Sequence, residues 1–157
     1  MLRPRHFIIA FMLTLLLPGA AAADNMISLG WQHTGPASGF SLKIPIDDFL
    51  AVQPMLTLSL QDRGDGLGGH ATYGVRGFLN LPVLGPFHPY VGAGIGRSDR
   101  LEGGQSQAIQ GYQAFLGAEY DLGHLRPSLE VALGRLDKPG GAMYVGTMFN
   151  FGLHYSF

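Results

Sequence analysis

The end of the chain alternates strictly between two kinds of side chain. From Met143 to Phe157 the odd-numbered positions are apolar except for one threonine, and the even-numbered positions are mostly small or polar. A repeat of two residues is that of a β-strand, whose successive side chains point to opposite faces. A segment of this length fits one tilted strand across a bilayer. The pattern therefore predicts a strand with one face against lipid and the other toward a polar lumen.

The same period recurs along the chain and predicts eight strands. They span residues 26–33, 39–47, 51–62, 70–81, 89–99, 107–121, 125–136 and 142–157. Each has an apolar face opposite a face of small and polar residues. A sheet edge left open in lipid would leave backbone groups unpaired, at several kcal/mol each, so the sheet has to close. We therefore predict an all-β fold, an eight-stranded antiparallel up-and-down transmembrane β-barrel.

A soluble β-sandwich is the competing interpretation, because its strands also alternate. The exposed face of a soluble sheet is usually rich in Lys, Glu and Thr, whereas the polar faces here are rich in glycine. The even number of strands and the aromatic residue at the end of the last strand also favour the membrane barrel.

Residues 1–23 have the pattern of a cleaved signal peptide. Arg3 and Arg5 precede an apolar run over 7–17, a Pro-Gly break and four alanines. The apolar run is about half of the roughly 20 residues that a membrane helix needs. We expect cleavage after Ala23, which leaves residues 24–157 as an outer-membrane β-barrel domain.

The composition of the expected mature chain narrows the function classes. Loss of the leader removes two of the 10 basic residues and leaves 8 against 11 acidic ones, a formal charge of −3. This balance gives no basic surface for nucleic acid. The chain has no cysteine, which excludes a disulfide-stapled secreted scaffold and thiolate chemistry.

The connections between the predicted strands fall into two groups. Those at 33–38, 63–69, 100–106 and 137–141 are polar and rich in glycine, and we expect them to be short outer loops. Those at 48–50, 82–88 and 122–124 are compact, as periplasmic turns are. Tyrosine and tryptophan near strand ends predict interfacial girdles. These residues are Trp31, Tyr73, Tyr112 and Tyr144 on the outer side, and Tyr90, Tyr120 and Tyr155 on the periplasmic side.

The predicted lumen faces carry five charges, in a space too narrow for an aqueous channel. They are Lys43, Arg76, Glu119, Arg126 and Glu130. We expect Glu119 to pair directly with Arg126 across a turn, and Lys43 and Arg76 to face Glu130 across the lumen. We also expect Gly94 and Gly92 to lie beside Arg76 and Phe78 on the neighbouring strand and to make room for these bulky side chains.

Several short patterns suggest chemistry, and none leads to a predicted catalytic, cofactor-binding or metal site. The glycine string over 92–96 lacks the helix that a dinucleotide site needs. The Arg-Gly-Asp tripeptide at 63–65 is short enough to arise by chance, and Asp62 and Asp65 lack calcium-loop spacing. Lipid A deacylases use a His-x-Ser pair, but His154 and Ser156 fall on the lumen face near the periplasmic end, away from the outer leaflet.

The stretch from Pro89 to Gly96 after an apolar turn, together with the alternating last strand ending at Phe157, resembles the OmpA/OmpX/Opa-type family of small outer-membrane barrels. The resemblance implies a place in the Gram-negative cell envelope, among outer-membrane lipid and lipopolysaccharide. It also implies recognition by the barrel-assembly machinery through the last strand. The residues concerned are Phe149, Phe151, Leu153, Tyr155 and Phe157.

Family members serve as structural proteins, adhesins or invasins, and occasionally as enzymes. The short loops differ from those of the adhesive members, and we expect no counterpart of the peptidoglycan-binding domain of full-length OmpA. We expect a monomer with a structural or interaction role, a side-chain-filled lumen and no catalysis. The alternatives are a narrow or gated pore for small solutes and an outer-leaflet lipid-modifying enzyme.

Overall fold

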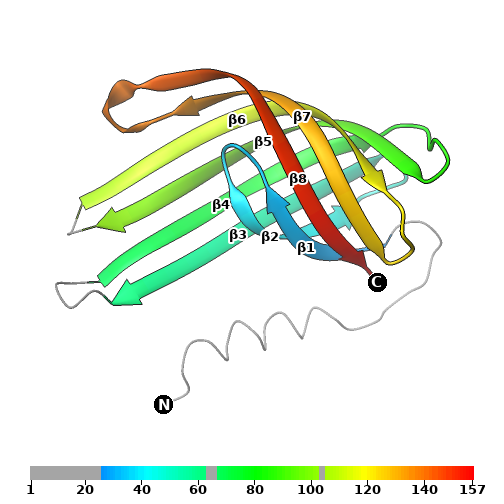
Figure 1. Ribbon diagram of the computed structural model, residues 1–157, viewed down its shortest axis with the longest axis horizontal. Helices are drawn as coiled ribbons and strands as arrows, with labels where there is room; N and C mark the ends of the chain where they lie inside the picture. Colours follow the sequence, from blue (N-terminus) through cyan, green and yellow to red (C-terminus); the bar gives the residue numbers. More distant parts are fainter. Residues whose placement is uncertain (1–25, 63–66, 103–104) are drawn as a thin grey trace, which may run out of the picture.

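The computed structural model describes residues 26–62, 67–102 and 105–157, most of which lie in strands (Figure 1). The expected signal peptide and the tripeptide at 63–65 lie outside the described residues. The elements are β1 (Ser28–His33), β2 (Ser38–Pro45), β3 (Leu50–Asp62), β4 (Leu67–Asn80), β5 (Phe87–Glu102), β6 (Gln105–Tyr120), β7 (Leu125–Asp137), the 3₁₀ turn η1 (Pro139–Gly141) and β8 (Met143–Ser156). The predicted strand bounds agree with these to within three residues.

The eight strands form one closed barrel. Each strand pairs antiparallel with its neighbours in sequence, and β8 pairs with β1 over the register from Ser28 with Ser156 to His33 with Phe151. The predicted fold, an eight-stranded antiparallel up-and-down barrel, is therefore confirmed. Within the described parts of the chain, no helix is long and apolar enough to cross a membrane.

The two ends of the barrel differ. The connections β2–β3, β4–β5 and β6–β7 lie at one end of the barrel, which we call the turn end. The hairpins β1–β2, β3–β4, β5–β6 and β7–β8 close at the opposite end, which we call the loop end. The β6–β7 turn is tight, because Leu122 bridges to Leu125 and Gly123 takes a φ of +82°. The backbone N–H of Gly123 donates to Asp121 Oδ1 at 2.6 Å. Glycine accommodates this left-handed conformation without strain.

Burial is inverted relative to a soluble protein, in which charged side chains are almost never fully buried. Outward-facing Leu129 and Phe149 are each 74% exposed, whereas the inward-facing Arg76 is 2% exposed. A small apolar cluster also lies inside the lumen. It comprises Ala51, Phe78, Tyr90, Phe115, Ala132 and Met148. Tyr90 was predicted for the periplasmic girdle, and that prediction is wrong: the residue shares the inward face of β5 with Gly92 and Gly94, so its ring packs inside.

The β1–β2 connection folds into the barrel and does not form the solvated outer loop that its composition predicts. We call residues Thr34 to Ala37 the plug. Thr34 is 2% exposed and Ala37 is 3% exposed. The backbone N–H of Thr34 donates to the Ala37 carbonyl at 3.1 Å, which keeps the plug compact. In Figure 1 the β1–β2 hairpin ends well short of the long β3–β4 and β5–β6 hairpins.

Glycines on the facing strands make space for the plug. A Cβ atom at Gly96 would lie 2.7 Å from the Ala37 Cβ, and one at Gly111 would lie 2.9 Å from the Pro36 Cβ. Both distances are shorter than side chains tolerate. The backbone N–H of Gly35 donates to Asn150 Oδ1 at 3.3 Å, which connects the plug to β8. The plug therefore occupies the lumen on the loop-end side of the charged residues.

Candidate functional site

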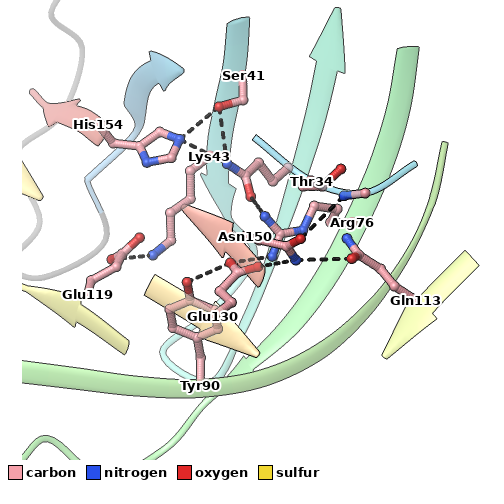
Figure 2. Close-up of polar contacts among 12 residues, drawn as sticks. Thr34, Ser41, Lys43, Arg76, Tyr90, Gln113, Glu119, Glu130, Asn150 and His154 are labelled. Carbon is pink, nitrogen blue, oxygen red and sulfur yellow. Dashed lines mark hydrogen bonds and ion pairs between the residues drawn. The ribbon is translucent and has the colours of Figure 1, made fainter. Parts of the chain in front are cut away.

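The lumen holds two buried ion pairs at its centre (Figure 2). Arg76 on β4 contacts Glu130 on β7, with 2.5 Å between Nη2 and Oε1. Lys43 on β2 contacts Glu119 on β6, with 2.7 Å between Nζ and Oε2. Four of the five lumen charges predicted from the sequence therefore form two pairs, each across the lumen and not between adjacent strands.

The side chain of Arg76 is held on several sides. Its Nη1 donates to Gln53 Oε1 at 3.2 Å, and its guanidinium lies 4.0 Å from the centre of the Phe115 ring. Arg76 pairs in register with Gly94, and Phe78 pairs with Gly92, as predicted. A Cβ at Gly94 would lie 2.8 Å from the Arg76 Cγ. The glycines of β5 thus give the large side chains of β4 the room that a narrow barrel otherwise lacks.

Glu130 accepts hydrogen bonds at both carboxylate oxygens. Tyr90 Oη donates to Oε1 at 2.7 Å, and Asn150 Nδ2 donates to Oε2 at 2.8 Å. Asn150 Nδ2 also donates to Gln113 Oε1 at 3.0 Å. Charge-assisted bonds of this kind offset part of the desolvation of a buried carboxylate. Tyr90, Asn150 and Gln113 were not predicted as members of this network, although all three occupy the polar or glycine-bearing face of their strands.

The predicted pairing of Glu119 with Arg126 is wrong. Because the β6–β7 turn closes between Leu122 and Leu125, Glu119 lies opposite Ser128, and Arg126 lies opposite His154 on β8. The Lys43 ammonium occupies the position at Glu119 that was expected for Arg126, and it also lies 4.9 Å from the centre of the Phe78 ring. The prediction that Lys43 faces Glu130 is therefore also wrong. The side chain of Arg126 makes no hydrogen bond or ion pair with any residue in the described parts of the chain, and its Nε is buried.

His154 and Ser156 both lie on the lumen face, as predicted, and each is bonded to another partner. His154 Nε2 is 2.7 Å from Ser41 Oγ and 2.9 Å from Gln53 Nε2. Ser156 Oγ is 2.7 Å from Ser28 Oγ on the neighbouring strand. These contacts join β8 to β1, β2 and β3 at the seam that closes the barrel, which is a structural role for both side chains.

A further histidine–serine contact lies near the loop end. His70 Nε2 is 2.7 Å from Ser98 Oγ and 3.1 Å from Thr72 Oγ1. Within the described residues His70 has no carboxylate partner to orient its ring, as a catalytic base usually has. Across the same residues, no group of three or more His, Asp or Glu side chains is arranged to hold a metal ion.

Five of the seven interfacial aromatics predicted from the sequence lie on the outward face of the barrel. Trp31, Tyr73, Tyr112, Tyr120 and Tyr155 are between 38% and 48% exposed. Tyr144 differs, because it pairs in register with the inward-facing Leu136 and lies over Gly146. The alternating apolar side chains of the last strand all face outward. They are Phe149, Phe151, Leu153, Tyr155 and Phe157.

No protein-family model matches the sequence, and no curated protein matches it. Among solved structures the chain is similar to Neisserial surface protein A, with 15% identity, 83% of this chain and 93% of that chain covered, and a TM-score of 0.46. It is also similar to CarO of Acinetobacter baumannii, with 9% identity, 84% and 98% covered, and a TM-score of 0.42. The fold assignment rests on the strand pairing and closure of the chain itself.

Proposed function

We propose that the protein is an outer-membrane barrel with a structural or interaction role and no catalysis. The observation that carries this proposal is the apolar outer face. Large apolar side chains stand exposed on successive strands, among them Leu56, Val91, Leu116, Leu129, Val131 and Phe149. A soluble monomer rarely exposes a continuous apolar surface of this kind, whereas lipid contacts it without penalty.

The filled lumen supports a structural role over a pore. The plug occupies the loop-end side, and the two ion pairs cross the centre. Opening a path for solutes would require the plug to leave and the pairs to separate, and breaking a buried pair typically costs about 3–5 kcal/mol. A barrel of eight strands is just wide enough for side chains to fill.

The expected partners belong to the same proposal. The apolar outward face is suited to contact with outer-membrane lipid and lipopolysaccharide. We propose that the barrel-assembly machinery recognises the outward-facing residues of β8 from Phe149 to Phe157. We propose export through a signal peptide cleaved after Ala23, and a monomeric state in the membrane.

The test combines location and conductance. The expressed protein should fractionate with the outer membrane, begin at Asp24, and migrate differently on gels before and after heating. In planar bilayers it should give no discrete current steps. Recovery as a soluble periplasmic protein would exclude the membrane barrel. Stable current steps would show a pore, and altered lipid A masses on overexpression would show an enzyme.

A further inference from the structure

Arg126 leaves the occluded lumen with one uncompensated positive charge. Three basic side chains, Lys43, Arg76 and Arg126, face two carboxylates, Glu119 and Glu130. The two ion pairs use both carboxylates, so no acid among the described residues neutralises Arg126. A partly buried guanidinium without a counter-charge is costly, since burial of an ion requires compensation.

Two further polar atoms without partners belong to residues that neighbour Arg126 on the inward face of the sheet. Within the described residues, Ser128 Oγ and His154 Nδ1 are buried without a hydrogen-bond partner, as is Arg126 Nε. Arg126 and Ser128 are two residues apart on the inward face of β7, and Arg126 is the register partner of His154 on β8. Ser128 is 4% exposed and His154 is 2% exposed. The three residues are thus neighbours on the lumen wall.

The hydrogen bonds of His154 identify its free ring nitrogen as a donor. Gln53 Oε1 accepts from Arg76, so the opposite end of this amide, Nε2, is the end that donates to His154 Nε2. Because His154 Nε2 accepts, the neutral ring carries its proton on Nδ1. A Cβ at Gly30 on β1 would lie 2.8 Å from His154 Cδ2, so this edge of the ring faces β1 and Nδ1 faces the opposite side. Figure 2 shows that nitrogen turned away from Ser41, toward the side of Glu119.

From this convergence we propose that the turn-end part of the lumen binds a small monovalent inorganic anion of the halide class. Arg126 supplies the charge and an N–H, His154 supplies the Nδ1–H, and Ser128 supplies its hydroxyl. The Gln32 amide from β1 lies beside Ser128 in front of Gly152, where a Cβ would lie 2.7 Å from Ser128 Oγ and 2.9 Å from Gln32 Cδ, and its Nε2 is a further buried N–H without a partner in the described residues. Glu119 is the nearest acid by register, and Lys43 neutralises it at 2.7 Å. Arg126 is only partly buried, so the ion can exchange with solvent at the turn end.

The first test locates the ion. Crystals of the full protein soaked in sodium bromide should give an anomalous difference peak in contact with Arg126 Nε and Ser128 Oγ. A water molecule at that place with no anomalous signal, bridging Arg126 to Glu119, would overturn the proposal.

The second test measures binding in solution. The urea midpoint of the protein in lipid should be higher in sodium chloride than in sodium gluconate at equal ionic strength, because a ligand that binds only the folded state stabilises it. Arg126→Gln should abolish this difference and Ser128→Ala should reduce it. Arg135→Gln removes an exposed, outward-facing arginine of the same strand and should preserve the difference. Equal midpoints for the unmodified protein in the two salts would overturn the proposal even if bromide is seen in soaked crystals.

Discussion

At the scale of single residues, the lumen is organised by glycines that decide where large polar side chains fit. A Cβ at Gly92 would lie 2.6 Å from the Phe115 Cζ and 2.7 Å from the Phe78 Cβ. A Cβ at Gly94 would likewise lie 2.8 Å from the Arg76 Cγ. Because a closely packed interior tolerates little extra volume, these positions on β5 exclude larger residues. The ion pair of Arg76 therefore depends on small residues of the adjacent strand as well as on its acidic partner.

The buried pair of Arg76 and Glu130 predicts a large effect of removing one partner. Arg76→Ala should destabilise the protein by about 3–5 kcal/mol, because Glu130 would remain buried without its counter-charge. Urea unfolding in a defined lipid would measure the change. Lys138→Ala is the control, since this lysine is exposed at the loop end and a surface substitution should change stability by less than about 0.5 kcal/mol. Indistinguishable midpoints for the two variants would contradict the buried pair.

At the scale of elements, the alternation of side chains predicted the strands well and their partners incompletely. A shift of one residue in register moves every side chain to the other face, so the apolar pattern specifies which face is inward. A shift of two residues preserves that pattern. The β6–β7 turn shows the consequence. A turn centred one residue earlier would place Glu119 opposite Arg126, and the observed turn places it opposite Ser128. The same faces of the strands point inward in both registers.

The plug could not be predicted from its own residues. Its composition is that of an ordinary surface loop, and the features that admit it are Gly74, Gly96 and Gly111 on three other strands. Those glycines become neighbours of Ala37 and Pro36 only after the barrel has closed. The ion-pair partners are similar, because Lys43 and Glu119 are 76 residues apart in sequence. Sequence alternation thus identified inward-facing charges, and the closed sheet determined which of them meet.

The inward position of the plug can be tested with an introduced thiol, because the chain has no cysteine. Ala37→Cys should react slowly with a polar, membrane-impermeant maleimide in intact cells, since Ala37 is 3% exposed. Lys138→Cys, at the same end of the barrel, should react quickly and serves as the control. Comparable labelling rates, with both variants shown to be folded by heat-modifiable migration, would place residues 34–37 in solvent.

At the scale of the whole molecule, the polar network lies inside the barrel and the apolar side chains cover its outside, which is the reverse of a soluble protein. Closure removes the free sheet edges, which is what a hydrocarbon environment requires of a β-structure. The seam extends beyond the β1–β8 register, because the Phe157 N–H donates to the Ile27 carbonyl at 3.1 Å. On the other side of β8, the Ser156 N–H donates to the His124 carbonyl at 2.7 Å and extends the pairing with β7. Side-chain contacts stabilise the lumen whatever surrounds the barrel. The stability of the outward-facing apolar surface, by contrast, depends on whether water or lipid contacts it.

This dependence on the solvent gives a prediction that separates a membrane barrel from a soluble one. Val131 lies at the centre of β7, faces outward and is 52% exposed. In a water-soluble barrel, Val131→Arg would change stability little, because the guanidinium would be hydrated. In a bilayer the same change should cost about 2–4 kcal/mol, since the side chain would lie near the midplane. Gln110→Arg, at an exposed position of β6 nearer the loop end, should cost about 0–1 kcal/mol at the interface. Folding both variants into vesicles and measuring their urea midpoints compares the two depths directly, and equal midpoints would show that the belt around Val131 does not contact lipid.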